Sequence, residues 1–267
     1  MIDLYDFHMH SDFSFDSDAT MESMVKSGID KGLKELCFTD HIEFAPAPPF
    51  ERWVVDVNAY HAEISRLQQL YGDKISLKMG AEIGYHPSQI KTANDYIESA
   101  DFDFILCSLH DINNEDFHHK IFTANKTPKV AFQMYFEEYE KCAKSGINYN
   151  CLSHYDFLKR YMQCNYDETF TDNYDTIKST FKFLIENGKG IEVNTSGYRY
   201  GLGHSLPTAE FLRLYRELGG EIITTGSDSH APKDVAAEFK NTYNLLREIG
   251  FKYITRFDKM KPEFISL

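Results

Sequence analysis

Short runs rich in β-branched and aromatic residues alternate along the chain with longer segments whose apolar residues recur at helical spacing. The first such pair predicts a strand over residues 3–8 and a helix over 21–31. Further strands are predicted over 36–39, 75–82, 102–108, 149–153, 190–194 and 221–225, with helices between them over 58–71, 88–98, 129–144, 174–187 and 208–218. Alternation this regular is typical of a parallel sheet covered by helices.

The end of the chain continues this pattern with a helix predicted over 235–249 and a short extended segment over 253–256. Gly188, Gly219 and Gly250 each follow a predicted helix, where a glycine readily adopts the left-handed backbone that closes it. No low-complexity segment or Pro-, Ser- or Gly-rich linker interrupts the series. We therefore expect residues 1–267 to form a single barrel-like α/β domain.

Three stretches lack periodicity and are longer than ordinary connections, namely 42–57, 111–127 and 155–172. Each follows a predicted strand. In a parallel barrel the segments that follow the strands gather at one rim, which is where active sites of this architecture lie. We expect these three loops to surround such a site.

Side chains able to bind metal ions fall at the carboxyl ends of six of the seven predicted strands. They are His8, His10, Asp40, His41, Glu82, His110, His154, Asp228 and His230. Any one of these histidines could be an ordinary core or surface residue. Their joint placement at strand ends, which converge on one rim, instead predicts a metal site built from distant parts of the chain.

The ligand types narrow the choice of metal. Imidazoles and carboxylates without thiolates suit zinc, iron or manganese and disfavour copper(I) or an iron–sulfur cluster. A catalytic zinc ion uses three protein ligands, and the histidines and acids at these strand ends exceed that number. We expect two to three divalent ions.

Composition excludes several classes of function. The 267 residues carry 28 Lys and Arg against 41 Asp and Glu, a formal charge of −13, which disfavours nucleic acids and anionic membrane surfaces as partners. The five cysteines form no CxxC pair, so neither a disulfide framework nor a zinc–thiolate site is indicated. With no apolar stretch of membrane-spanning length and no export signal, we expect a cytoplasmic location.

The motifs in their order along the chain resemble the polymerase and histidinol phosphatase (PHP) superfamily. They are His8-Met9-His10, Thr39-Asp40-His41, Gly80-Ala81-Glu82, Ser108-Leu109-His110, Ser153-His154 and Gly226-Ser227-Asp228-Ser229-His230. The resemblance covers essentially the whole chain and implies a distorted (β/α)7 barrel with a trinuclear metal centre. The segments 11–16 and 192–197 are similar to the monofunctional L-histidinol phosphate phosphatases of that superfamily.

The resemblance also implies a ligand set. The first ion would be bound by His8, His10, Glu82 and Asp228, and Glu82 would bridge to a second ion bound by His110 and His154. A third would be bound by Asp16, His41 and His230. Asp16 takes a position that some relatives fill with histidine, and both side chains bind zinc or iron. Asp40 is interpreted as a residue that orients a liganding imidazole.

The activity implied is hydrolysis of a small phosphate ester, L-histidinol phosphate, to L-histidinol and phosphate by a hydroxide that bridges the metals, a step of histidine biosynthesis. Glu82, as the bridging residue, is one candidate catalytic group. Arg160 and Arg199 are two more: both lie in predicted rim loops, and the resemblance identifies both as donors to the phosphoryl group. We expect replacing either arginine to lower the rate and leave the metal content unchanged.

Other residues are weaker candidates. His204 is a candidate proton donor to the leaving group, and Glu43, Arg52 and Trp53 are candidates to contact the amine or imidazole of the substrate. The remaining histidines, His61, His86, His118 and His119, are expected at the surface or behind the site.

Alternative functions remain open at this point. The same metals with different rim loops would serve a phosphoesterase acting on nucleotides or another small phosphate ester. A non-catalytic domain with structural metals is a second possibility. A metal-dependent deaminase or amidohydrolase is a third, and it is less favoured because such sites usually need fewer ligands.

Overall fold

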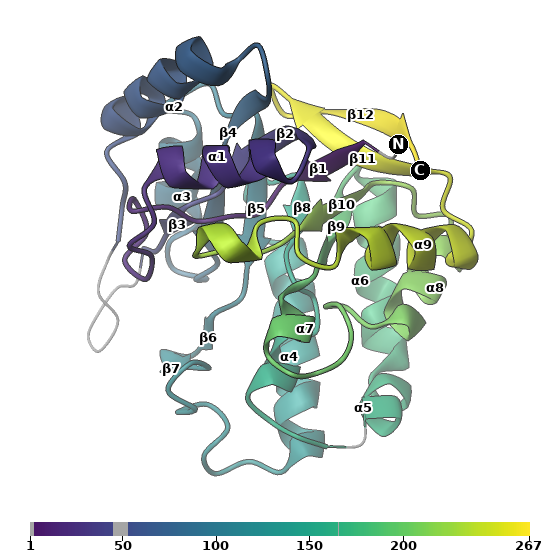
Figure 1. Ribbon diagram of the computed structural model, residues 1–267. Coiled ribbons are helices and arrows are strands. Elements are labelled where there is room, and N and C mark those ends of the chain that lie inside the picture. Colours follow the sequence, from purple (N-terminus) through teal and green to yellow (C-terminus); the bar gives the residue numbers. More distant parts are fainter. Residues whose placement is uncertain (1–2, 45–52, 165) are drawn as a thin grey trace.

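The computed structural model describes residues 3–44, 53–164 and 166–267. Parallel strands form the centre of the fold, as Figure 1 shows. In sheet order they are β1 (Leu4–Asp6), β2 (Leu33–Phe38), β4 (Ser76–Gly84), β5 (Phe104–Ser108), β8 (Cys151–Leu152), β9 (Gly190–Asn194) and β10 (Ile223–Gly226). The two-residue strand β3 (His41–Ile42) pairs with β4 beyond the end of β2.

The outer strands β1 and β10 also meet, so the sheet is a nearly closed barrel. Phe7 N donates to Thr225 O at 2.9 Å, and Asp228 N donates to His8 O at 2.8 Å. A bridge between Met9 and Ser229 continues this contact past the strand ends. The predicted distorted (β/α)7 barrel is therefore confirmed.

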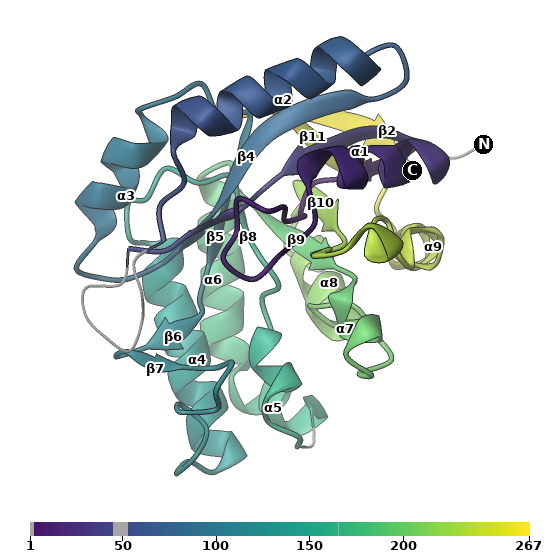
Figure 2. The same ribbon diagram turned by 60° about the vertical axis from the view of Figure 1, so that its left-hand side comes forward.

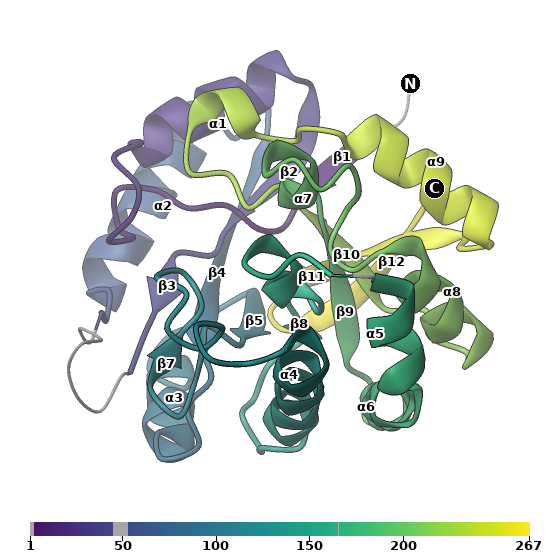
Figure 3. The ribbon, with the colours of Figure 1, turned by 90° about the horizontal axis from the view of Figure 1, so that it is seen from below.

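Helices surround the strands, as Figure 3 shows, and the longer ones pack against the barrel. They are α1 (Met21–Asp30), α2 (Val57–Tyr71), α3 (Ile90–Ile97), α4 (Pro128–Ala143), α6 (Tyr174–Glu186), α8 (Ala209–Glu217) and α9 (Phe239–Ile249). Helix α4 shows why they form: Thr127 caps its amino end by accepting from Val130 N, Pro128 occupies the first turn, and one face buries Phe132 and Tyr135 against the barrel.

A hairpin of β11 (Tyr253–Asp258) and β12 (Lys261–Ser266) closes the amino-terminal end of the barrel. Phe257 packs inside this end, with its ring centre 4.9 Å from that of Phe104. Met260 N donates to Asp103 O at 2.9 Å, just before β5, and Asn150 Nδ2 donates to Met260 O at 3.1 Å, just before β8. The opposite end is thus the open one.

The open end carries the long segments that follow β5 and β8, which lie away from the hairpin in Figure 2. Residues 45–52, which make up most of the predicted loop over 42–57, lie outside the described part of the chain. The stretch 111–127 contains the small hairpin β6 (Asp111–Ile112) and β7 (Glu115–Asp116). The expectation of an irregular segment over 155–172 was wrong, since it contains the 3-10 turn η1 (Phe157–Arg160) and helix α5 (Tyr166–Asp172). A short helix α7 (Ser196–Arg199) follows β9.

Backbone conformation explains where the helices begin and end relative to the predictions. Gly188, Gly219 and Gly250 have φ values of 64°, 94° and 103°, so all three close helices as predicted. The last helix begins at Phe239 instead of residue 235 because Ala236 and Glu238 are left-handed, with φ of 50° and 62°. Of the helices in the described part of the chain, none has the length and apolar character that a membrane span needs.

Candidate metal centre

The barrel brings the strand ends together through a buried carboxylate. Asp6, at the end of β1, accepts hydrogen bonds from Ser227 N at 2.9 Å and Ala236 N at 3.0 Å. This ties the end of β1 to the segment that follows β10. His8 therefore lies beside Asp228, although 220 residues separate them in the chain.

Glu82, buried on β4, lies at the centre of the site. Its Oε2 atom is 3.0 Å from His41 Nδ1, 3.3 Å from His8 Nε2 and 3.5 Å from His10 Nε2. The pairing of β3 with β4 places His41 directly opposite Glu82 in the sheet. Three imidazoles from two different strand ends thus surround one carboxylate oxygen.

The other oxygen of Glu82 faces a second pair of imidazoles. Glu82 Oε1 is 3.0 Å from His154 Nε2 and 3.4 Å from His110 Nε2, and it accepts a hydrogen bond from Ser108 Oγ at 2.6 Å. One carboxylate therefore serves two groups of candidate ligands, as a residue bridging two ions would.

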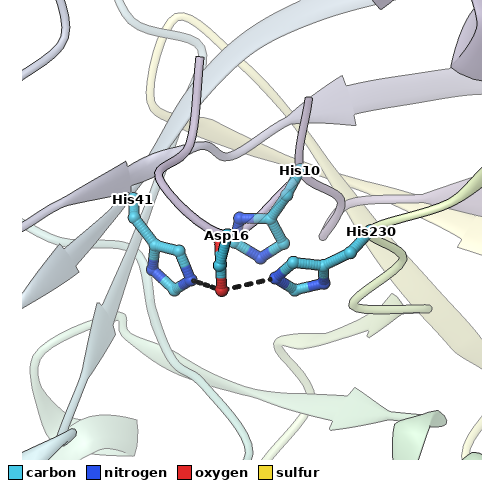
Figure 4. A group of neighbouring side chains, drawn as sticks. All are labelled: His10, Asp16, His41 and His230. Atoms are coloured by element: carbon cyan, nitrogen blue, oxygen red, sulfur yellow. Dashed lines mark hydrogen bonds and ion pairs between the residues drawn. The ribbon is translucent and has the colours of Figure 1, made fainter. Parts of the chain in front are cut away.

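A third group forms around Asp16, in the loop between β1 and α1 (Figure 4). Asp16 Oδ2 lies 3.0 Å from His230 Nε2 and 3.4 Å from His41 Nε2. The ring of His10 stacks on His230 and His41, with centres 4.1 and 4.3 Å apart. His10 therefore adjoins both this group and the one at Glu82 Oε2.

Asp228 connects the first and third groups from the side of β10. Its Oδ1 atom is 3.4 Å from His10 Nε2 and 3.7 Å from His230 Nδ1. Burial raises the pKa of this carboxyl, but His8 and His10 outweigh that effect and hold the pKa well below its usual range. Burial also raises the pKa of Glu82, but nearby groups, chiefly His8 and His41, outweigh burial and hold this pKa well below its usual range. Both carboxylates are thus available as charged ligands.

Hydrogen bonds behind the imidazoles fix which ring nitrogen faces the site. His8 Nδ1 donates to Glu192 Oε1 at 2.6 Å, and His110 Nδ1 donates to Glu43 Oε1 at 2.6 Å. His230 Nδ1 donates to the carbonyl oxygen of Asp228 at 3.0 Å. Each of these rings then turns an Nε2 atom toward a carboxylate, with a lone pair available for a cation.

Asp40 orients the imidazole of His10 through the hydroxyl of Ser14. It accepts from Ser11 N at 2.6 Å and from Ser14 Oγ at 2.7 Å. Having donated its proton to Asp40, the Ser14 hydroxyl accepts from His10 Nδ1 at 3.2 Å and from His41 N at 3.0 Å. Asp40 thus lies behind the site, one hydroxyl away from a candidate ligand.

These donors fit divalent metal ions. Ligands bound tetrahedrally at about 2.0–2.1 Å lie about 3.3 Å from one another, close to the separations around Glu82. Glu82 Oε2 is buried and has no hydrogen-bond partner among the described residues, and His8 Nε2 and His10 Nε2 face each other at 3.1 Å. Lone pairs packed this closely need a positive charge between them, and a group of imidazoles and carboxylates without thiolates suits zinc, iron or manganese.

Both predicted arginines contact Asp228. Arg160 donates from Nη2 to Asp228 Oδ2 at 2.8 Å and also to Ser196 Oγ. Arg199 donates from Nη2 to the carbonyl oxygen of Asp228 at 2.6 Å and from Nη1 to that of Ser227 at 3.2 Å. Each arginine therefore has a structural contact, which the sequence alone did not indicate.

Glu192 is a buried residue of the candidate site to which the sequence assigned no role. Besides accepting from His8, its Oε2 atom accepts from His154 N at 2.9 Å, so this one buried carboxylate supports two candidate ligands. The available signal was its place in the motif of residues 192–197, two residues before Asn194, whose Nδ2 donates to it at 3.2 Å.

The weaker candidates have mixed placements. Glu43 lies at the site through His110, and Trp53 is half-buried at its edge, donating from Nε1 to Phe13 O at 2.8 Å. The Nδ1 atom of His204 lies 2.9 Å from the carbonyl oxygen of the next residue, Ser205. Arg52 lies outside the described residues. The roles suggested for them toward the substrate stay predictions. His61, His118 and His119 are exposed and His86 is half-buried.

Known proteins resemble this chain in sequence over most of its length. The PHP domain family model matches residues 6–196. A histidinol-phosphatase of Lactococcus lactis subsp. lactis is 31% identical over 263 residues, covering 96% of this chain and 95% of that protein. The chain therefore belongs to the PHP domain family.

A solved structure extends the match to three dimensions. It is the crystal structure of histidinol phosphate phosphatase from Lactococcus lactis subsp. lactis, complexed with zinc, L-histidinol and phosphate. It superimposes with a TM-score of 0.89 at 29% identity and covers 97% of this chain and 98% of that one. The two structures therefore share the same fold over nearly the whole of both chains.

Proposed function

We propose that this chain is a metal-dependent phosphatase that hydrolyses L-histidinol phosphate to L-histidinol and phosphate. The observation that carries the proposal is Glu82, whose two oxygens face separate groups of imidazoles on a rim that also holds two arginines. The relatives described above support it: one is a histidinol-phosphatase, and the solved structure is a histidinol phosphate phosphatase in complex with zinc, L-histidinol and phosphate, the latter two being the products of that reaction.

The metal ions would be two to three in number and would be zinc, iron or manganese. We assign His8, His10, Glu82 and Asp228 to the first ion, Glu82, His110 and His154 to the second, and Asp16, His41 and His230 to the third. When bound, such ions supply a Lewis-acidic surface for the phosphate and make water acidic enough to act as a nucleophile near neutral pH.

The balance of charge at the rim supports an anionic substrate. Three divalent ions bring six positive charges and the carboxylates of Asp16, Glu82 and Asp228 remove three, so about three remain, enough for a phosphomonoester dianion. This local field acts at short range, where screening does not weaken it. The overall charge of −13 therefore does not prevent phosphate binding.

Arg160 and Arg199 would bind the nonbridging phosphate oxygens. Guanidinium groups present paired donors to phosphate, and donors aimed at the transferring group stabilise the charge that develops on it. The side chain of Arg160 is 6% exposed and that of Asp228 is 8% exposed, so their contact is shielded from water. Burial lowers the pKa of Arg160, but its neighbours, chiefly Asp228, together outweigh burial and raise the pKa, so this donor stays charged.

A phosphate-release screen tests the proposal against its alternatives. Metal-loaded protein is assayed with L-histidinol phosphate, nucleoside monophosphates and small sugar phosphates, with chelated protein as the control. We expect L-histidinol phosphate to be preferred by at least tenfold in kcat/KM. Comparable rates on all esters would favour a broader phosphoesterase, and no turnover on any of them would favour a non-catalytic metal-binding domain.

We also infer that the chain works in the cytoplasm as one domain over residues 1–267. Five cysteines are free, four of them buried, which suits a reducing compartment. The terminal hairpin packs into the barrel through Phe257, which supports a single folding unit that includes the end of the chain.

A further inference from the structure

Aromatic rings and guanidinium groups alternate in a series of contacts along the open end of the barrel. The ring of His154 stacks on Phe157, with centres 4.2 Å apart. The Arg160 guanidinium lies 4.5 Å from the Phe157 ring and 4.0 Å from the Tyr200 ring, and the Arg199 guanidinium lies 5.6 Å from Tyr200. We call these five residues the stacking series.

Tyr200 differs from the other two aromatic residues of the stacking series, His154 and Phe157, because its ring is exposed and theirs are buried. It directly follows α7, and 57% of it is exposed, the highest value among the described large hydrophobic side chains that face solvent. So exposed a ring adds little to the stability of the fold by burial. Its ring contacts with Arg160 and Arg199 suggest another role for it.

Both arginines that contact Tyr200 also contact Asp228, one through its carboxylate and the other through its backbone. An arginine side chain has many rotamers, and holding its planar group in one orientation reduces the entropy lost when it binds a phosphate. A tyrosine face within about 6 Å attracts a guanidinium and can hold it in this way. The ring of Tyr200 therefore contacts two guanidinium groups that lie at the same edge of the metal centre.

We propose that Tyr200 is a positioning residue that holds Arg160 and Arg199 in place to bind the phosphoryl group of the substrate. The proposal rests on the proposed phosphatase function, in which both arginines bind phosphate. We attribute the positioning of the two arginines to the face of the Tyr200 ring and not to its hydroxyl. A variant that keeps the ring should therefore behave differently from one that keeps only the bulk.

The variants Tyr200→Phe and Tyr200→Leu separate these cases, and Tyr253→Leu is the matched control. Tyr253 is also an exposed tyrosine, 44% accessible, but it lies on β11 at the closed end of the barrel. We expect Tyr200→Phe to retain most of the wild-type kcat/KM on L-histidinol phosphate. Tyr200→Leu should lose about 3- to 30-fold, the range that corresponds to a cation–π contact between exposed and desolvated limits. Tyr253→Leu should match wild type, and all variants should bind equal amounts of metal.

A double-mutant cycle shows whether the ring acts through the arginine. In the Arg160→Ala background, Tyr200→Leu should cost clearly less than in the wild-type background, because its main partner is gone. The same fold loss in both backgrounds, or a Tyr200→Phe variant as impaired as Tyr200→Leu, would overturn the proposal. Reduced metal content in Tyr200→Leu would do the same, since the effect would then be structural.

A binding measurement keeps this test independent of turnover. The dissociation constant for inorganic phosphate is measured by calorimetry on metal-loaded wild type and on the same variants. If the wild type releases no phosphate from L-histidinol phosphate, the proposed function fails, but weaker phosphate binding by Tyr200→Leu alone would still support the positioning role. Equal phosphate binding by Tyr200→Leu and wild type would contradict it.

Discussion

Arg199 supports the backbone of Asp228: its Nη2 atom donates to the Asp228 carbonyl oxygen at 2.6 Å. Asp228 has a φ of 52°, a left-handed conformation that costs a non-glycine residue roughly 1–2 kcal/mol. In this conformation its carboxylate reaches His10 at 3.4 Å. The arginine therefore stabilises the strained turn that presents a candidate metal ligand.

This contact predicts two effects for Arg199→Ala. Losing a donor to the phosphoryl group should lower kcat/KM on L-histidinol phosphate by about 10² to 10³. The metal content should fall as well, because the turn at Asp228 loses support. This second effect replaces the expectation from sequence that the metal content would not change. Rate and metal stoichiometry are measured on the same preparation, and an unchanged metal content would show that the turn holds without Arg199.

Arg160→Lys tests a different property, the shape of the donor. Lysine keeps the positive charge beside Asp228 but cannot present two parallel donors to phosphate oxygens. We expect it to recover only part of the activity that Arg160→Ala loses, with the metal content of both variants near that of wild type. Full recovery in kcat/KM would mean that Arg160 contributes charge alone, and near-wild-type activity in Arg160→Ala would exclude it from the site.

Glu192→Gln should weaken metal binding although Glu192 is not itself expected to bind an ion. Partners behind ligating histidines typically affect metal affinity about 10- to 100-fold. Glu35→Gln is a matched control, because Glu35 is also a buried glutamate on a strand but pairs with Arg256 at the closed end. Competition with a chelator of known affinity measures both variants. Equal metal affinities would remove Glu192 from any supporting role.

Phe257→Ala tests the contribution of the terminal hairpin to stability. Phe257 is 1% exposed and packs against Phe7 and Phe104 inside the barrel. Removing a buried phenylalanine typically costs about 3–5 kcal/mol. We expect a loss of that size in the free energy of unfolding, measured with urea, and no change in the amount of metal bound by the folded variant. A loss below about 1 kcal/mol would show that the hairpin is not part of the core.

The sequence predicts the barrel and much of the rim because both depend on local patterns. The alternation of strand and helix periodicity gives the parallel strands, and their carboxyl ends converge whatever fills the loops. His8 and His154 could therefore be assigned to one pocket without any knowledge of their contact. The structure places both against Glu82.

The parts that the sequence did not reveal depend on contacts between distant side chains. Glu192 lies on a buried strand and has no strand-end position to mark it, so its contact with His8, 184 residues away, needs coordinates. The contacts of the two arginines with Asp228 depend in the same way on the conformation of long side chains. The strand Lys261–Ser266 is mostly exposed and contains a proline, so it lacks the apolar alternation from which strands are predicted.

The central claim is that Glu82 joins two metal ions in a centre that hydrolyses L-histidinol phosphate. Its most direct test is elemental analysis combined with phosphate release while metal-free protein is titrated with zinc, iron(II) or manganese, using wild type, Glu82→Gln and Asp16→Asn. We predict that wild-type activity reaches its plateau only after two or more equivalents are bound. Glu82→Gln should lose more metal and more activity than Asp16→Asn, because Asp16 belongs to the third group alone. Full activity without metal or at one equivalent, or a larger metal loss in Asp16→Asn, would contradict the account.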